Sequence, residues 1–157
     1  MSKTVVMLIG PKGSGKTHIG AVVARQTGMA FLRVEPLWLS LEPGQDGWAR
    51  VESEVDRALA DTDSVMIESL GSGPGFERLR TNLAAKYGVK YVRIKVELDT
   101  CLQRVRTRSN AEHIPVSDDQ VERYNVLAAE VELDWDAEID NNALASTEEI
   151  LAVFASL

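Results

Sequence analysis

A glycine-rich segment near the N-terminus has the composition and spacing of a phosphate-binding loop. It reads Gly10-Pro11-Lys12-Gly13-Ser14-Gly15-Lys16-Thr17 and matches the pattern G-x-x-x-x-G-K-[ST] at every fixed position. Glycines let backbone N–H groups turn inward around an anion, and the following helix adds partial positive charge at its N-terminus. We expect Lys16 to reach the β- and γ-phosphates of a nucleotide and the Thr17 hydroxyl to bind Mg²⁺. The segment therefore predicts binding of ATP or GTP.

Two further side chains of this region are candidates for nucleotide binding. Lys12 lies inside the loop and could contact phosphate, although a solvated side chain at a variable position is the favoured alternative. His18 directly follows the loop. A glycine-rich turn that matches by chance is the alternative for the whole motif, and the predicted strand before it and helix after it argue against chance.

Two glutamates follow predicted strands. Glu35 comes after the run 30–34, and Glu68 follows Val65-Met66-Ile67, a pattern typical of a Walker B strand with Glu where Asp is usual. Ligands of an open parallel sheet gather at the carboxyl ends of its strands, so both side chains should face the phosphate loop. A carboxylate there can orient or deprotonate a hydroxyl, or hold Mg²⁺ through water. The alternative is a pair of surface glutamates beside loops.

Arginines cluster on one predicted helix. Arg104 and Arg108 are four residues apart and share a helix face, whereas Arg106 points elsewhere. Two guanidinium groups at this spacing could flank ATP, one stacked on adenine and one close to the transferred phosphate. A solvated basic helix end, favoured by the helix dipole, is the alternative.

The composition is that of one globular domain. The chain has 157 residues, 45% of them hydrophobic and 26% charged, with a formal net charge of -7 that argues against a general nucleic-acid surface. The single cysteine, Cys101, allows no internal disulfide and suits a reducing compartment. The apolar run 5–9 is too short for a signal peptide, and no stretch approaches the roughly 18 apolar residues of a membrane span. We therefore expect a cytoplasmic protein without membrane contact, and a monomer.

Strands and helices are predicted to alternate along the chain. Strands are expected at 3–9, 30–34, 64–67, 89–98 and 137–139, and helices at 15–28, 48–60, 76–87, 100–108, 116–133 and after Ser146, where Glu149 completes a capping box. The segment 36–47 is expected to be irregular. Such alternation implies a parallel sheet covered by helices on both faces, in one α/β domain over residues 1–157.

With these features in order, the chain resembles the small P-loop kinases of the shikimate kinase-like and nucleoside monophosphate kinase-like superfamily. Four segments carry the resemblance. The first two resemble shikimate kinases: Gly44-Gln45-Asp46-Gly47-Trp48-Ala49-Arg50-Val51-Glu52 is similar to their segment G-E-x-x-F-R-x-x-E, and Gly71-Ser72-Gly73 lies where they have a glycine run after the third strand. The segment 104–108 is similar to the R-x-x-x-R that enters the lid of nucleoside monophosphate kinases, and Asp140-Asn141-Asn142 lies where the superfamily has a loop near adenine. The resemblance implies a three-layer α/β/α sandwich with strand order 2-3-1-4-5 and a short lid over about 109–117.

The resemblance also implies roles for residues. Glu35 stands where the family has the second acid of its D-x-D, while Arg33 replaces the first, and the arginine that grips shikimate falls at Ala49 with Arg50 one step displaced. The loops 36–50 and 70–76 would choose the acceptor, and Trp38, Trp48, Arg50 and the run 71–73 are expected at that site. Packing under the irregular segment is the alternative for the tryptophans. In the lid, His113 could touch substrate or be solvated.

The predicted function is Mg²⁺-dependent transfer of the ATP γ-phosphoryl group to a hydroxyl of an unidentified small molecule. Lys16, Arg104 and Arg108 would stabilise charge, Thr17 and Glu68 would bind the metal, and Glu35 or Glu68 would orient the acceptor. A nucleotide or polynucleotide kinase would use the same residues. A nucleotide-dependent switch or ATP-binding protein with slow hydrolysis is the third interpretation.

Overall fold

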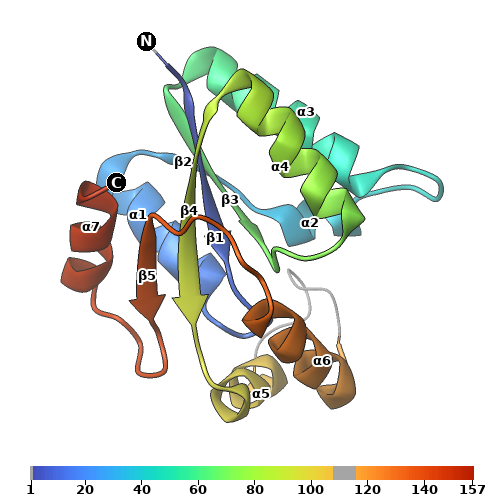
Figure 1. The fold of residues 1–157 in the computed structure, drawn as a ribbon, viewed down its shortest axis with the longest axis vertical. Coiled ribbons are helices and arrows are strands. Elements are labelled where there is room, and N and C mark those ends of the chain that lie inside the picture. The colour runs from blue at the N-terminus through green and yellow to red at the C-terminus, as the bar shows by residue number, and fades with distance from the viewer. Residues whose placement is uncertain (1, 108–115) are drawn as a thin grey trace.

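A five-stranded parallel sheet lies at the centre of the molecule (Figure 1). The computed structural model describes residues 2–107 and 116–157. Its strands are β1 (Thr4–Ile9), β2 (Ala30–Leu32), β3 (Ser64–Ser69), β4 (Gly88–Lys95) and β5 (Ala137–Asp140), in the order β2-β3-β1-β4-β5. The predicted fold class and strand order are confirmed.

Helices cover both faces of this sheet (Figure 1). They are α1 (Lys16–Thr27), α2 (Val34–Leu39), α3 (Gly47–Asp61), α4 (Pro74–Lys86), α5 (Leu98–Thr107), α6 (Asp118–Ala129) and α7 (Thr147–Ala155). The predicted capping box at Ser146 and Glu149 begins α7. Within the two described ranges, none of these helices is long and apolar enough to cross a membrane.

Alternate residues of the strands fill two separate cores. Val5, Met7 and Ile9 of β1 pack with α3 and α4, whereas Val6 and Leu8 pack with α1 and α7. Side chains of successive strand residues point to opposite faces, so a strand covered on both faces needs a continuous apolar run. This is why β1 reads as uninterrupted apolar sequence directly before the glycine loop.

Strand register brings the candidate residues to one edge of the sheet. β1 pairs with β3 so that Leu8 is opposite Glu68 and Ile9 opposite Ser69. The loop after β1 therefore starts beside Glu68, and α5 and α6 lie beyond the carboxyl ends of β4 and β5 (Figure 1). Parallel strands expose their carboxyl ends on the same edge, which is where ligands of such sheets bind.

The segment around Glu35 differs from the prediction. β2 ends at Leu32 rather than at residue 34, and Val34–Leu39 forms a short helix, α2, where irregular chain was expected. Pro36 lies in the first turn of this helix, where a missing N–H costs nothing because first-turn N–H groups have no intrahelical partner. Glu35 consequently projects from a helix start and not from a strand end.

Candidate functional site

The loop after β1 surrounds a cavity of about 340 Å³. Its conformation requires glycine at two places, because Gly13 and Gly15 have φ angles of 82° and 94°. A Cβ at Gly13 would lie 2.6 Å from the Cys101 carbonyl oxygen, so the loop packs directly on α5. The cavity is lined by Lys12, Gly13, Ser14, Gly15, Lys16, Thr17, His18, Ala21, Glu35, Glu68 and Arg104.

Lys16 folds over the loop that precedes it. Its Nζ donates hydrogen bonds to the carbonyl oxygens of Gly10 and, at 3.4 Å, Pro11. Burial lowers the pKa of Lys16 from 10.5 to about 8, because desolvation of the ammonium outweighs the attraction of Glu68 and Glu35, and Lys12 adds repulsion. Anionic oxygens bound beside this amine would favour its charged form and raise the pKa again.

Thr17 and Glu68 form a pair of oxygen donors beside Lys16. The Thr17 hydroxyl donates to Glu68 Oε2 at 3.2 Å, and Glu68 is only 4% exposed. Its other oxygen, Oε1, is buried and has no hydrogen-bond partner among the described residues. Buried carboxylate oxygens normally have partners, so this atom fits a site that hydrated Mg²⁺ completes.

Protein groups alone would not enclose such a metal. No cluster of three or more His, Cys, Asp or Glu side chains suited to a metal occurs in 2–107 or 116–157. Mg²⁺ usually keeps several waters and is bound through one or two carboxylates together with substrate phosphates. The donor set at Thr17 and Glu68 has this character.

Lys12 and Glu35 form an ion pair at the mouth of the loop. Lys12 Nζ lies 2.9 Å from Glu35 Oε2, and the two side chains are 20% and 13% exposed. The favoured interpretation of Lys12 as a solvated side chain was therefore wrong. The helical start of α2 turns Glu35 back toward the loop, where the two charges neutralise each other.

A second cavity, of about 230 Å³, adjoins the phosphate-loop cavity. It is lined by Lys12, Lys16, Val34, Glu35, Trp38, Trp48, Glu68, Ser69, Leu70, Ser72 and Tyr124. The rings of Trp38 and Trp48 meet edge to face, with centroids 5.5 Å apart and planes at 78°. The two cavities share Lys12, Lys16, Glu35 and Glu68 as lining residues.

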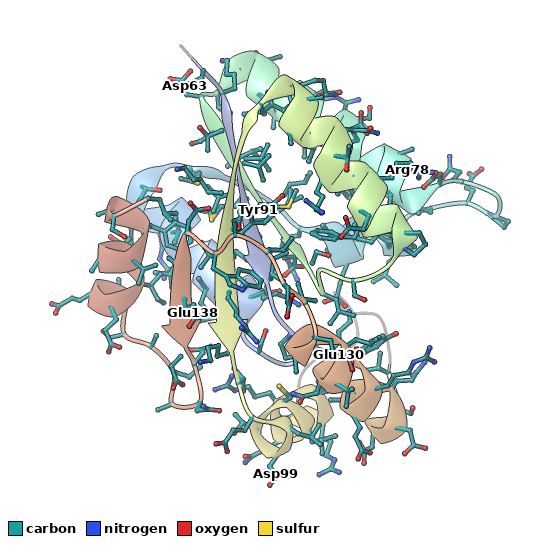
Figure 2. The ribbon with its side chains drawn as sticks, in the orientation of Figure 1. Asp63, Arg78, Tyr91, Asp99, Glu130 and Glu138 are labelled. Atoms are coloured by element: carbon teal, nitrogen blue, oxygen red, sulfur yellow. The ribbon has the colours of Figure 1, made fainter. Side chains whose placement is uncertain are left out.

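The start of α3 holds Trp48 in place. The carboxylate of Asp46 accepts hydrogen bonds from the backbone N–H groups of Trp48 and Ala49, as an N-cap residue does. The same carboxylate accepts a 2.7 Å hydrogen bond from Arg78. Figure 2 labels Arg78, which belongs to α4. These contacts fix the position of the Trp48 backbone against α4.

Asn141 and Arg104 support the loop from behind. Asn141 is fully buried, with Nδ2 donating to the Ser14 carbonyl at 2.8 Å and Oδ1 accepting from Ala145 N at 2.8 Å. Asn141 lies in the segment that resembles a loop near adenine, but both ends of its side-chain amide are used inside the protein. Arg104 donates to the carbonyls of Gly13 and Ser14 at 3.4 and 3.3 Å and to that of Asn141 at 2.6 Å, while still lining the loop cavity.

The remaining candidates divide between the two cavities and the surface. His18 is exposed at the rim of the loop cavity. Ser72 lines the second cavity, whereas Gly71 and Gly73 line, with Ser72, a separate hollow beside α6. The Arg50 side chain is 44% exposed, bonds Glu54 at 3.2 Å and does not line the second cavity, so its acceptor role stays a prediction.

Some predictions fall outside the described residues, and some lining residues were missed. The structure does not describe the range 108–115, which contains Arg108, His113 and most of the predicted lid at 109–117. Tyr124 lines the second cavity but was not predicted. Leu70 also lines it and belongs to the loop 70–76 that was expected to choose the acceptor. Nothing local marks Tyr124, which reaches the cavity from α6.

Comparison of the sequence with known proteins finds one family model and several curated relatives. Residues 5–130 match a family described as an AAA domain. A shikimate kinase of Baumannia cicadellinicola subsp. Homalodisca coagulata is 29% identical over 120 residues, 69% of this chain and 66% of that protein. A shikimate kinase of Methylococcus capsulatus is 31% identical over 103 residues, 59% of this chain and 57% of that protein. The chain thus spans less than two thirds of the length of these relatives.

Solved structures share the fold at low sequence identity. A protein from Chloroflexus aurantiacus matches with a TM-score of 0.77 at 13% identity over 100% of both chains. A gluconokinase from Sinorhizobium meliloti matches with a TM-score of 0.66 at 15% sequence identity, and the match covers 98% of this chain and 90% of that one. A shikimate kinase from Acinetobacter baumannii in complex with shikimate matches with a TM-score of 0.62 at 19% sequence identity, and the match covers 98% of this chain and 94% of that one. At these identities the likeness concerns the fold alone.

Proposed function

The chain belongs to the AAA-domain family that it matches over residues 5–130, and we propose that it transfers the γ-phosphoryl group of ATP to a hydroxyl group of a small molecule. One observation carries the proposal: the phosphate-loop cavity and the second cavity share Lys12, Lys16, Glu35 and Glu68. A kinase needs two adjoining sites with charged groups at their junction, where phosphate passes from donor to acceptor. A protein that only binds nucleotide needs no second cavity there.

The residues at the junction have complementary tasks. Lys16 and the loop N–H groups bind the β- and γ-phosphates and offset charge as it moves to the leaving ADP. Thr17 and Glu68 hold hydrated Mg²⁺, which supplies further neutralisation of phosphate charge. The acceptor oxygen bonds to the γ-phosphorus while the bond to the bridging oxygen of ADP breaks, and the hydroxyl proton passes to the Glu35 carboxylate.

Arg104 has an indirect part in this proposal. Its guanidinium bridges the carbonyls of Gly13 and Asn141, so it holds the loop against the chain after β5. It also lines the loop cavity and adds positive charge there. Preorganised positive charge around the phosphates lowers the barrier because little rearrangement is needed during transfer.

Calorimetry and an acceptor screen test the proposal. Mg²⁺-ATP should bind the native chain and Lys90→Ala equally and bind Lys16→Ala at least about tenfold more weakly, because Lys90 is a surface lysine remote from the loop. A library of hydroxyl-bearing metabolites, assayed by ADP formation, should contain at least one compound that raises ADP release above the background. Equal ATP affinity of Lys16→Ala and the native chain would contradict the assignment of the loop.

A further inference from the structure

The second cavity has a wall of aromatic side chains. Trp38 and Trp48 form a corner, with ring planes at 78° and centroids 5.5 Å apart. Phe76, which is buried, packs edge-on against Trp48 with centroids 6.3 Å apart. Tyr124 and Leu70 add further aromatic and aliphatic surface to the lining. Rings of this kind favour stacked or edge-to-face contact with another planar ring.

Two glycines allow the indole rings to take these positions. A Cβ at Gly47 would lie 2.5 Å from Trp38 Cε2, and one at Gly75 would lie 2.3 Å from Trp48 Cδ1. Both glycines lie in the first turns of helices, α3 and α4, where glycine is a poor helix former. The close approach of ring to backbone therefore fixes both walls of the corner.

Apart from Glu68 Oε1, which is assigned above to hydrated Mg²⁺, the charged groups of this cavity already have contacts within the protein. Lys12 and Glu35 pair at 2.9 Å, and Lys16 donates to carbonyls of the loop. Glu68 accepts from Thr17. Among the described residues the lining contains no arginine, and Arg50 lies outside it. A carboxylate or ammonium bound against the tryptophans would lose its water and would have to compete with these internal partners for an opposite charge, which is unfavourable.

We infer that the phosphate acceptor is a small, uncharged alcohol with one planar ring, bound in the corner of Trp38 and Trp48. The inference rests on the kinase function proposed above and specifies its substrate class. The volume of about 230 Å³ suits a single ring with short substituents, since drug-sized ligands occupy about 300–1,000 Å³. The hydroxyl would point to the shared charged junction, where the γ-phosphoryl group arrives.

Four matched probes separate the effect of an aromatic ring on binding from the effect of a charge. They are para-(hydroxymethyl)benzamide, the corresponding benzoate, para-(aminomethyl)benzyl alcohol and the saturated cyclohexane counterpart of the benzamide. Binding to the full chain is measured by calorimetry, without nucleotide. The benzamide should bind roughly five- to tenfold more tightly than its saturated counterpart because it can pack on the indoles. The affinity for the benzamide should also be about tenfold or more higher than the affinity for the benzoate or for the ammonium compound.

Tryptophan variants locate the site. Trp48→Leu should lose the preference for the benzamide over its saturated counterpart, while Trp48→Phe, which keeps an aromatic ring, should retain most of it. Trp135→Phe is the matched control, because Trp135 is also partly buried but contacts Arg93 and does not line this cavity. Thermal unfolding of each variant shows that the fold is kept.

The outcomes distinguish this inference from the kinase proposal. Stronger binding of the benzoate or the ammonium compound, no binding of the benzamide, or an unchanged preference in Trp48→Leu would each overturn the neutral-ring acceptor. None of those results would bear on the kinase proposal, because that proposal is tested by the effect of Lys16→Ala on Mg²⁺-ATP binding. Conversely, equal ATP affinity of Lys16→Ala and the native chain would overturn the kinase proposal, whichever probe binds.

Discussion

The pKa of Lys16 predicts that nucleotide binding takes up a proton. Burial lowers this pKa to about 8 in the structure, where the amine lies on carbonyl oxygens of the loop. Phosphate oxygens favour the ammonium form and should return the pKa to at least its ordinary value near 10.5. At a pH of about 8, half of the Lys16 side chains are neutral, so each bound ATP should take up about half a proton.

The same linkage sets the pH dependence of affinity. If only the ammonium form binds the phosphates, the apparent dissociation constant grows as pH rises through the pKa of the free protein. With a pKa of about 8, affinity should fall about tenfold between pH 7 and pH 9. The sign follows from a pKa that is lower in the free than in the bound state, and a group whose pKa fell on binding would give the opposite trend.

Calorimetry in buffers of different ionisation enthalpy measures both quantities. The slope of observed enthalpy against buffer enthalpy gives the number of protons taken up, and the dissociation constant is obtained in the same titrations. Lys16→Arg serves as a control because a guanidinium stays charged across this range, so its affinity for ATP should not change with pH in this way. Flat affinity of the native chain from pH 7 to pH 9, with no proton uptake, would refute the reasoning.

Three substitutions test the roles of Glu35 and Glu68 at the junction and of Asn141 behind the loop. Glu35→Gln should lower phosphoryl transfer by roughly 10²–10⁴-fold in an ADP-release assay, because an amide cannot accept the hydroxyl proton; activity near native would move that role to Glu68. Glu68→Gln should raise the Mg²⁺ concentration needed for half-maximal ATP binding, as an amide is a poorer partner for hydrated Mg²⁺, and an unchanged Mg²⁺ titration would contradict the metal site. Asn141→Ala should lower the free energy of unfolding by about 2 kcal/mol in urea, because the Ser14 carbonyl and Ala145 N–H lose buried partners. The control for that last measurement, Asn82→Ala, changes an exposed asparagine and should have little effect.

The sheet and the phosphate loop could be predicted because their signals are local. β1 and β3 are short apolar runs bounded by turn residues, and a strand buried on both faces needs such a run. The loop pattern fixes the residue types at four of its positions, and parallel pairing then brings Glu68 beside the loop. The resemblance to small P-loop kinases, drawn from these motifs, is confirmed by the family match and the shared fold.

Residues whose roles depend on distant partners could not be predicted in the same way. Asn141 contacts Ser14 across 127 positions, and Arg104 contacts Ser14 across 90. Both were expected to face nucleotide because their sequence neighbourhood suggested a ligand site. A polar side chain beside a ligand and one that supports the ligand-binding backbone have the same sequence signal, and only the packed structure separates them.

The pairing of Lys12 with Glu35 shows why charges at this site act together. Read separately, the lysine was assigned to solvent and the glutamate to the acceptor, yet their side chains meet at 2.9 Å with little exposure. Removing one member of a poorly exposed pair leaves the other charge without its partner. Glu35→Gln therefore changes two things, the proton acceptor and the environment of Lys12. Because Lys12 and Glu35 both line the phosphate-loop cavity, a change of ATP affinity in that variant reports on the altered charge of the pair. A loss of transfer at constant ATP affinity isolates the carboxylate itself.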